Sequence, residues 1–318
     1  MTDRLVWERD GTHWPHRSAS RFVLADGLRW HVQEFAPGPR DSPPTGATVT
    51  ARNTAPPNAL LIHGTGAATH SWRGVAPLLA AHFRVLTLDL PGHGFTDMPG
   101  DGPNSRQFSL PGMAVAVRVL LQELGISPAL VIGHSAGAAL GVRLCLDGLE
   151  SPRLVLGINA ALLPLGGLAG QVFSPVAKLM AVAPFVPQMF SRRAANPAVL
   201  QRLIDGTGST LDPQGLALYG QLVRNPGHAA GALAMMANWG LPQLARDMPR
   251  LTTPLHLLVG TNDRTISPRQ ADEVRTMLPL STPSSVTALA GLGHLAHEER
   301  PDWVADWVLA RWQAIQAR

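Results

Sequence analysis

Strand-like runs and helix-like stretches alternate along most of this chain, and this alternation limits the fold more than any other feature. The six runs are ALLIH (59–63), RVLTLDL (84–90), ALVIGH (129–134), RLVLGIN (153–159), PLHLLVG (254–260) and SSVTAL (284–289). Apolar strands that alternate with helices form parallel sheets whose two faces are both covered. The sequence therefore predicts an α/β protein with a mostly parallel central sheet and helices on both of its faces.

The alternation stops after Asn159 and resumes about 90 residues later. Between these points, residues 160–245 are rich in Leu, Ala, Met and Pro and show no convincing strand pattern. We interpret this segment as a helical cap inserted into one α/β core, which comprises residues 21–159 and 246–318. A chain of 318 residues is long enough for a single large core with such an insertion.

The N-terminal part carries three local patterns. Residues 1–20 are polar but include two tryptophans, so we expect an irregular arm that docks its aromatic rings on the body. Two strand runs then flank the dipeptide Asp26-Gly27, which favours a two-residue hairpin turn. Residues 38–57 are rich in Pro, Thr and Gly, and this composition predicts an exposed, flexible loop.

Composition excludes several classes of protein. With 45% hydrophobic and only 15% charged residues, most of the chain is expected to fold. The net charge is +4, but the arginines form no basic stripe interleaved with aromatic residues, so nucleic acid is not an expected partner. Cys145 is the single cysteine, and we expect it to be buried on a helix. The lack of a signal-peptide pattern and of a long apolar run predicts a cytoplasmic protein, with peripheral contact to the inner membrane surface left open.

The pentapeptide GHSAG, residues 133–137, lies between a predicted strand and a predicted helix. This placement is typical of a nucleophile elbow, in which a tight turn holds the serine in a strained conformation above the sheet. The flanking glycines let neighbouring backbone pass close by. Ser135 is therefore a candidate nucleophile, and the N–H of Ala136 a candidate donor to an oxyanion. The alternative is a turn that matches the pattern by chance.

The remaining parts of such a centre occur in the expected chain order. Thr65 follows the first apolar run, and its N–H is our candidate for the second oxyanion donor; the alternative is a glycine-rich turn at the sheet edge. Asp263 and His294 each follow a late strand, as the acid and base of a serine centre would. His297 is the alternative base. Asn159 occupies another strand end where an acid could stand, but an amide cannot take that role.

Other motifs argue against cofactor and metal chemistry. The segment GTGAAT lacks a complete dinucleotide fingerprint, and no Walker A motif is present. The segment HLAHEER differs from the H-E-x-x-H zinc pattern. We therefore expect no cofactor and no metal. His93, in the Pro-Gly turn of DLPGHGFT, is expected to shape its loop rather than to act in catalysis.

Five segments together resemble the α/β-hydrolase family over almost the whole chain: HGTGAATHSW, LDLPGHGFTD, GHSAGA, GTNDRTISP and GLGHLAHEERP. The resemblance implies the α/β-hydrolase fold, with Ser135, Asp263 and His294 at the positions of the catalytic triad. The segments WERDGTHWPHRSASRF, GLRWHVQEF and LLIHGTGAATHSWRGVAPLLA resemble the magnesium-chelatase accessory proteins of bacteriochlorophyll synthesis. That resemblance implies a role near the insertion of magnesium into protoporphyrin IX, and residues 38–57 look like an insertion relative to those proteins.

Two functional hypotheses follow. In the first, the chain is an accessory protein at the magnesium-chelatase step, built on a serine-hydrolase scaffold. A tetrapyrrole under the cap, chelatase subunits and a membrane surface are then its expected partners. In the second, the chain is a serine esterase unrelated to pigment synthesis, and an apolar ester-like molecule binds under the cap. Whether the chain is an enzyme is left open by the sequence, because a motif and a fold do not fix a function.

Overall fold

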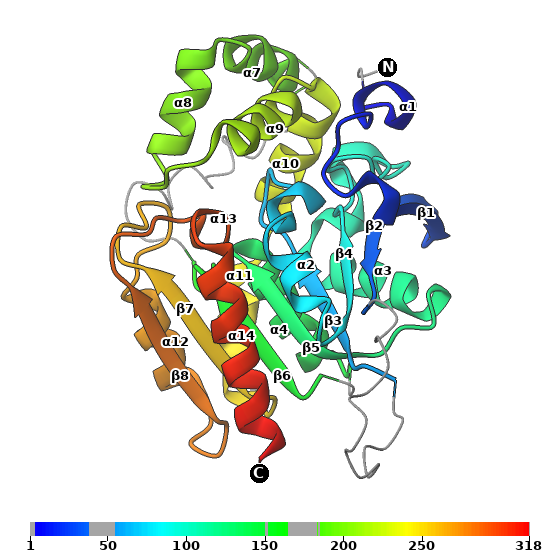
Figure 1. The fold of residues 1–318 in the computed structure, drawn as a ribbon. Coiled ribbons are helices and arrows are strands. Elements are labelled where there is room, and N and C mark those ends of the chain that lie inside the picture. The colour runs from blue at the N-terminus through cyan, green and yellow to red at the C-terminus, as the bar shows by residue number, and fades with distance from the viewer. Residues whose placement is uncertain (1–3, 38–54, 150–151, 165–182, 184, 318) are drawn as a thin grey trace, which may run out of the picture.

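The computed structural model describes residues 4–37, 55–149, 152–164, 183 and 185–317. Within them, eight strands form one twisted sheet (Figure 1). The strands are β1 (Ser20–Ala25), β2 (Leu28–Phe35), β3 (Asn58–Ile62), β4 (Arg84–Leu88), β5 (Pro128–His134), β6 (Leu154–Ile158), β7 (Leu255–Gly260) and β8 (Ser284–Leu289). Their order is β1-β2-β4-β3-β5-β6-β7-β8; β2 is antiparallel to β1 and β4, and the other neighbouring pairs are parallel. The predicted fold class is confirmed.

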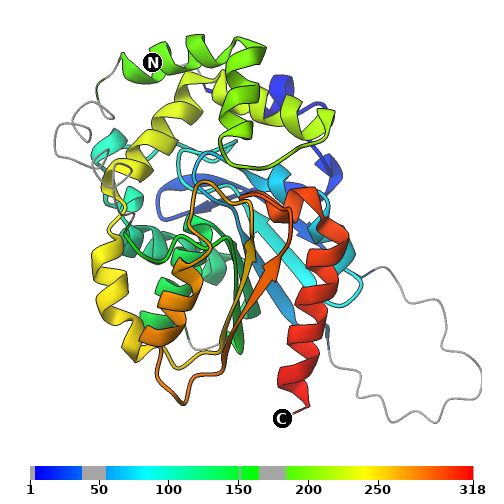
Figure 2. The same ribbon diagram turned by 90° about the vertical axis from the view of Figure 1, so that its left-hand side faces the viewer.

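Helices cover both faces of this sheet. The described helices are α1 (Trp7–Asp10), α2 (Val75–Leu79), α3 (Leu110–Glu123), α4 (Ala136–Leu146), α7 (Val186–Ala194), α8 (Pro197–Asp205), α9 (Pro213–Val223), α10 (Pro226–Asn238), α11 (Leu241–Asp247), α12 (Gln270–Met277), α13 (Ala296–Glu299) and α14 (Pro301–Gln316). Short 3₁₀ turns are η1 (Arg17–Ala19), η2 (Thr69–Trp72), η3 (Gly102–Asn104), η4 (Arg106–Phe108) and η5 (Met248–Arg250). Helices α2 and α14 lie on one face, and α3, α4 and α12 lie on the other (Figures 1 and 2).

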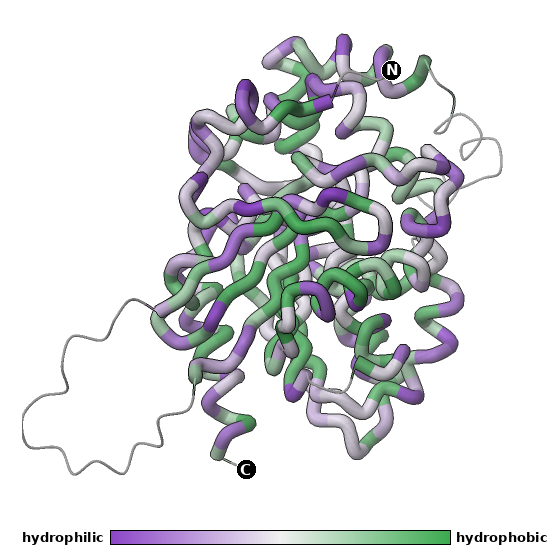
Figure 3. Tube along the Cα trace, turned by 90° about the vertical axis from the view of Figure 1, so that its right-hand side faces the viewer, coloured by the Kyte–Doolittle hydropathy of each residue, from purple (hydrophilic) through white to green (hydrophobic). Residues whose placement is uncertain are grey.

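The inner strands are apolar on both sides because each side packs against a layer of helices. On β3, Leu60 and Ile62 belong to a core cluster with α3 and α4, whereas Ala59 and Leu61 belong to a second cluster with α2 and α14. All four side chains are fully buried. Figure 3 shows this pattern, because the trace through the middle of the molecule is largely coloured green, for hydrophobic residues. Cys145 on α4 packs beside the first cluster but is only half-buried, less than we expected from the sequence.

The hairpin β1–β2 forms as the sequence predicts. Ala25 pairs with Leu28, so that Asp26 and Gly27 are the two loop residues. Both have positive φ, at 46° and 75°. A two-residue turn of type I′ requires positive φ at both positions, which is why Asp-Gly suits it. The hairpin extends the antiparallel edge of the sheet beyond β4.

The described residues between β6 and β7 form helices and loops and contain no strand. Helices α7 to α10, which we name the cap helices, lie above the carboxyl ends of the parallel strands (Figures 1 and 2). The predicted cap boundary at residue 245 falls inside α11. That helix packs on α4, and Arg143 donates to Asp247 at 2.6 Å. Residues 38–54 of the predicted loop, and residues 165–182 and 184 of the predicted cap, lie outside the described part of the chain.

Three of the cap helices begin at an Asx-Pro pair. The pairs are Asn196-Pro197, Asp212-Pro213 and Asn225-Pro226. Each Asx side chain accepts a hydrogen bond from a backbone N–H of the first helical turn, which would otherwise lack a partner. Proline suits the next position because its fixed φ is helical and no N–H is needed there. The sequence thus specifies where these helices start.

The N-terminal arm packs aromatic side chains on the core, and it is not wholly irregular, because it contains α1 and η1. Trp7 packs edge-on against Phe22 and Phe95, with ring centroids 5.6 and 4.8 Å apart. Trp14 is 3% exposed, and its indole N–H donates to Thr69 Oγ1 at 3.0 Å. The arm therefore packs on η2, which follows the loop after β3.

Candidate active site

The elbow around Ser135 has the strained geometry that the sequence predicts. β5 ends at His134 and α4 begins at Ala136, so Ser135 is the single residue between strand and helix. Its φ and ψ are 51° and −119°, a region that residues with a Cβ rarely adopt. A Cβ on Gly133 would lie 2.3 Å from Ala138 N, and one on Gly137 would lie 2.2 Å from Ile62 O. Both glycines are therefore required by close backbone contact.

The loop after β3 reaches Ser135 because β3 and β5 are neighbours in the sheet. Ile62 pairs with Gly133, and a Cβ on Gly64 would lie 3.0 Å from Ser135 Cβ. Neither the N–H of Thr65 nor that of Ala136 donates a hydrogen bond to another described residue. Two backbone donors next to the serine are therefore without a partner in the described part of the protein. Free backbone donors are one requirement of an oxyanion hole, so both groups stay candidates for that role.

The candidate acid and base are hydrogen bonded to each other. Asp263 follows β7 and His294 precedes α13, and both are largely buried. His294 Nδ1 lies 2.8 Å from Asp263 Oδ2. Asp263 Oδ1 accepts from the N–H groups of Thr265 and Ile266, at 2.8 and 2.9 Å. A carboxylate that accepts at Nδ1 fixes the proton there, which leaves the lone pair of His294 on Nε2, the atom that a general base needs free.

His134 connects this pair to the elbow. Its Nε2–H donates to the backbone carbonyl of His294 at 2.8 Å, and the two rings lie 4.8 Å apart. His134 directly precedes Ser135 in the chain, so the residue that binds the backbone of His294 is the neighbour of the serine. The Ser135 hydroxyl makes no hydrogen bond to a described residue, so the structure joins acid to base but not base to serine. Such contacts are often long in the absence of substrate.

His297, the alternative base, is placed differently. Its side chain is fully buried, and neither ring nitrogen has a hydrogen-bond partner among the described residues. The ring instead packs on His134 and Trp72, with centroid distances of 4.4 and 4.7 Å. Burial lowers the pKa of His297 to about 3. The structure therefore pairs Asp263 with His294 and pairs His297 with no acid.

Sequence reasoning missed the role of Asn159. This residue follows β6, has a φ of 45° and is almost fully buried. Its Nδ2–H donates to Asp263 Oδ2 at 2.7 Å, the same oxygen that bonds His294. The sequence placed Asn159 at a strand end where an acid could stand. An amide at that position also supports an acid on the neighbouring strand, because β6 pairs with β7.

A second unforeseen contact comes from the loop between α8 and α9. The carbonyl of Thr207 accepts from the N–H of His294 at 3.1 Å and from that of Arg264 at 3.2 Å. Ser209 Oγ accepts from the N–H of Leu295 at 2.8 Å. A Cβ on Gly208 would lie 2.0 Å from the carbonyl oxygen of Asn262. This loop therefore fastens the strand-end segments that carry the acid and the base.

Asp89, at the end of β4, organises the other side of the site. It is fully buried and contacts His31 Nδ1 at 2.7 Å. It also accepts from the N–H groups of Thr69 and Phe95, at 2.7 and 2.9 Å. Burial alone would raise the pKa of Asp89, but His31, His63 and the hydrogen bond from Phe95 hold it well below its usual range. His93 in the same loop is buried, and its Nδ1 contacts the carbonyl of Pro91 at 3.0 Å, which fits the structural role that we expected.

A cluster of charges joins cap helix α9 to the core. Arg73 is hydrogen bonded to Glu298, and its other terminal nitrogen lies 3.1 Å from Asp212. The hydroxyl of Tyr219 donates to Glu298 at 2.7 Å. Burial raises the pKa of Glu298 to about 7, although Arg73 and Tyr219 act in the opposite direction. A cleft of about 410 Å³ opens beside this cluster.

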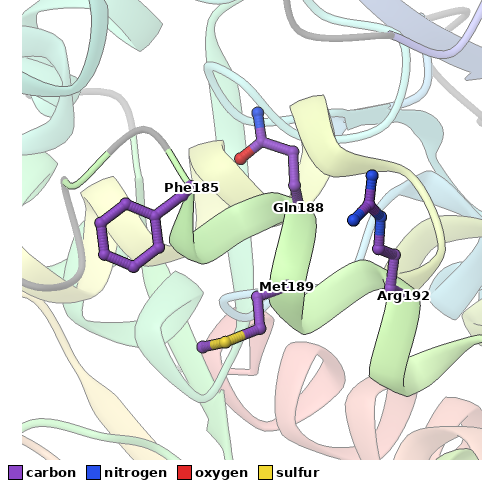
Figure 4. Close-up of a pocket in the computed structure, with 4 residues that line it drawn as sticks. All are labelled: Phe185, Gln188, Met189 and Arg192. Atoms are coloured by element: carbon purple, nitrogen blue, oxygen red, sulfur yellow. The ribbon is translucent and has the colours of Figure 1, made fainter.

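A second recess, of about 570 Å³, lies beside α7 (Figure 4). Its described lining consists of Phe185, which precedes α7, and of Gln188, Met189 and Arg192 on that helix. Phe185 and Met189 are 65% and 59% exposed. No group of three or more His, Cys, Asp or Glu in the described ranges is arranged to hold a metal ion. None of the described helices combines the length and the hydrophobicity of a transmembrane span.

Comparison with known proteins identifies the family of this chain. A model of the alpha/beta hydrolase family matches residues 59–307. The chain belongs to the alpha/beta hydrolase family. This α/β-hydrolase is 36% identical over 297 residues to the Magnesium-chelatase 30 kDa subunit of Rhodobacter capsulatus, which covers 93% of this chain and 95% of that protein. Over 95 residues it is 37% identical to Fluoroacetate dehalogenase of a Burkholderia species, covering 30% of this chain and 31% of the relative.

Solved structures agree on the fold. The crystal structure of an alpha/beta hydrolase fold protein from Burkholderia ambifaria matches this α/β-hydrolase with a TM-score of 0.70 and 22% identity, over 92% of this chain and 97% of that chain. At this level of identity the likeness shows the fold alone. Both family resemblances stated from the sequence are confirmed by the family model and by the chelatase relative.

Proposed function

We propose that this α/β-hydrolase is an accessory protein at the magnesium-chelatase step of bacteriochlorophyll synthesis and that it retains a serine-hydrolase centre. The single observation that carries the first part is the 36% identity to a magnesium-chelatase subunit over 93% of the chain. The buried Asp263–His294 pair beside the strained Ser135 supports the second part. An ordered acid–base pair of this kind has no evident use in binding alone.

In the proposed chemistry, Ser135 Oγ attacks an ester-like carbonyl while His294 Nε2 takes its proton. The developing oxyanion is bound by the N–H groups of Thr65 and Ala136. His294 then returns the proton to the leaving oxygen as the C–O bond breaks, and Asp263 stabilises the imidazolium between these steps. Water, deprotonated by His294, releases the acyl group from Ser135.

The proposed partners follow from the cap helices. An apolar small molecule or a tetrapyrrole such as protoporphyrin IX binds beneath them, and subunits of the magnesium chelatase receive or supply it. We assign to the exposed residues of α7 and its N-cap a peripheral contact of this cytoplasmic protein with the inner membrane surface. There, exposed Phe185 and Met189 stand beside Arg192, a combination that suits an anionic lipid surface (Figure 4).

A fluorophosphonate probe tests the hydrolase centre without knowledge of the substrate. We expect the purified protein to be labelled, and Ser135→Ala and His294→Ala to abolish labelling. Ser281→Ala, at an exposed serine, is the matched control and should be labelled like the wild type. If the folded wild-type protein is not labelled, Ser135 is not an activated nucleophile, and the elbow is only a structural feature of the fold.

A chelatase assay tests the accessory role separately. We expect the protein to raise the rate at which purified magnesium chelatase forms magnesium protoporphyrin, followed by fluorescence. We also expect micromolar protoporphyrin IX to quench its tryptophan fluorescence. The second candidate function is a serine esterase unrelated to pigments, which the complete set of Ser135, His294 and Asp263 favours. Labelling by the probe, with no effect on the chelatase and no quenching, would favour that alternative.

A further inference from the structure

One face of cap helix α10 rests on the loops that surround Ser135. His228, Gly231 and Met235 are spaced at i, i+3 and i+7, which places them on one side of the helix. The side chain of Asn225 caps α10 by accepting from the N–H of His228 at 2.9 Å, so the histidine lies in the first turn. All three residues are buried. This stripe therefore faces the core and not the solvent.

Each residue of the stripe touches a core loop. His228 Nδ1 accepts from the N–H of Gly94 at 3.0 Å, and its Nε2 lies 3.1 Å from the carbonyl oxygen of Gly66. A Cβ on Gly231 would lie 2.1 Å from Gly92 O, so helix and loop meet backbone to backbone. Met235 Sδ accepts from Thr65 Oγ1 at 3.5 Å. The helix has no room to approach further.

Two of these contacts flank the candidate oxyanion donor. The N–H of Ala67 donates to Gly64 O at 3.2 Å, so residues 64–67 form a tight turn, and Gly66 has the positive φ of 78° that its third position requires in a type II turn. Thr65 is the second residue of that turn. Met235 holds its side chain, and His228 holds the carbonyl of the next residue. Contacts from cap helix α10 thus set the direction of the Thr65 N–H.

We infer that α10 sets the oxyanion hole and that His228 is a positioning residue for it, tying the Thr65 turn to the cap. The inference rests on the proposed hydrolase centre. Only a neutral ring with its proton on Nε2 can accept from Gly94 and donate to Gly66 together. Burial lowers the pKa of His228 to about 4, so the ring keeps this form at neutral pH.

The test uses the fluorophosphonate reaction, in which the Ser135 Oγ–P bond forms, the P–F bond breaks and fluoride leaves. The phosphoryl oxygen then occupies the oxyanion hole. His228→Gln can still donate toward Gly66, His228→Asn can still accept from Gly94, and His228→Leu can do neither. We expect the maximal labelling rate to fall in the order wild type, Gln, then Asn and Leu. The Leu variant should be tenfold to a hundredfold slower with the probe affinity unchanged, because small misplacements of a positioned donor cost about this much.

The matched control is His70→Leu. It also removes a fully buried histidine, one whose ring nitrogens have no hydrogen-bond partner among the described residues. It should be labelled at the wild-type rate. A folded His228→Leu protein that is labelled as fast as the wild type would overturn the inference. If that variant does not fold, equal rates for the Gln and Asn variants overturn it. An unlabelled wild type removes the hydrolase centre and this inference with it, whereas loss confined to the His228 variants supports both.

Discussion

The buried ring of His297 makes a quantitative prediction about stability and pH. Its pKa is lowered to about 3 in the folded protein, by burial first and then by the charges of His294 and Arg73; the ordinary value is 6.5. Well above pH 6.5 neither the folded nor the unfolded state binds this proton. Below it, the unfolded chain binds the proton and the folded protein does not, so stability falls as the pH falls. Between pH 7.5 and 5.0 this one histidine costs about 2 kcal/mol.

His297→Leu should remove that contribution. The variant keeps similar volume and deletes two buried nitrogens that lack described partners, so its stability at pH 7.5 should match or exceed that of the wild type. Urea unfolding followed by tryptophan fluorescence, at pH 7.5 and at pH 5.0, measures both values. Both free energies of unfolding should fall from pH 7.5 to pH 5.0. The fall should be about 2 kcal/mol smaller for the variant than for the wild type.

The control is His82→Leu, which removes an exposed histidine in place of a buried one. Equal losses for wild type and His297→Leu between the two pH values would refute the reasoning, because the buried ring would then not be the source. The same variant separates the two candidate bases. It should still react with the fluorophosphonate probe, and a folded but unreactive His297→Leu protein would assign the base to His297.

Three further predictions concern the elbow and its acid. Ser135→Gly should be more stable to urea than Ser135→Ala by about 1–3 kcal/mol, because glycine relieves the strain at a φ of 51°; equal stabilities would mean that the turn stores no strain. Gly137→Ala should lose about 1–3 kcal/mol of stability and its labelling, since the new Cβ would lie 2.2 Å from Ile62 O; wild-type values for both would contradict the packing. Asn159→Leu should slow labelling about tenfold by loosening Asp263, and an unchanged rate would leave Asn159 without a role in the site.

The parts of the fold that the sequence predicts are those encoded locally. Apolar runs identify buried strands, Asp26-Gly27 identifies a hairpin, and the glycines around Ser135 identify an elbow, because each depends on neighbouring residues alone. The candidate acid and base were found in the same way, since strand ends of a parallel sheet meet at one edge. Their assignment as catalytic residues stays a prediction until the labelling experiment is done.

The contacts that sequence reasoning missed join segments far apart in the chain. Asn159 reaches Asp263 across 104 positions, and His228 reaches Gly66 across 162. Neither contact has a local sequence signature, because asparagine at a strand end and histidine in a helix are both common. A glycine that meets another backbone is the exception. Gly208 and Gly231 could have drawn notice, since glycine is costly inside or beside a helix unless close contact requires it.

The Thr207 carbonyl accepts hydrogen bonds from the amides of both His294 and Arg264, and this has a consequence for recombination between relatives. A chimaera that takes its cap helices from one relative and its core from another would break these hydrogen bonds, which align the two strand-end segments. Junctions would have to preserve residues 206–211 or transfer the facing segments together with them. Diversification is then expected on the solvent side of α7 and α8, where new specificities can arise without disturbing those bonds.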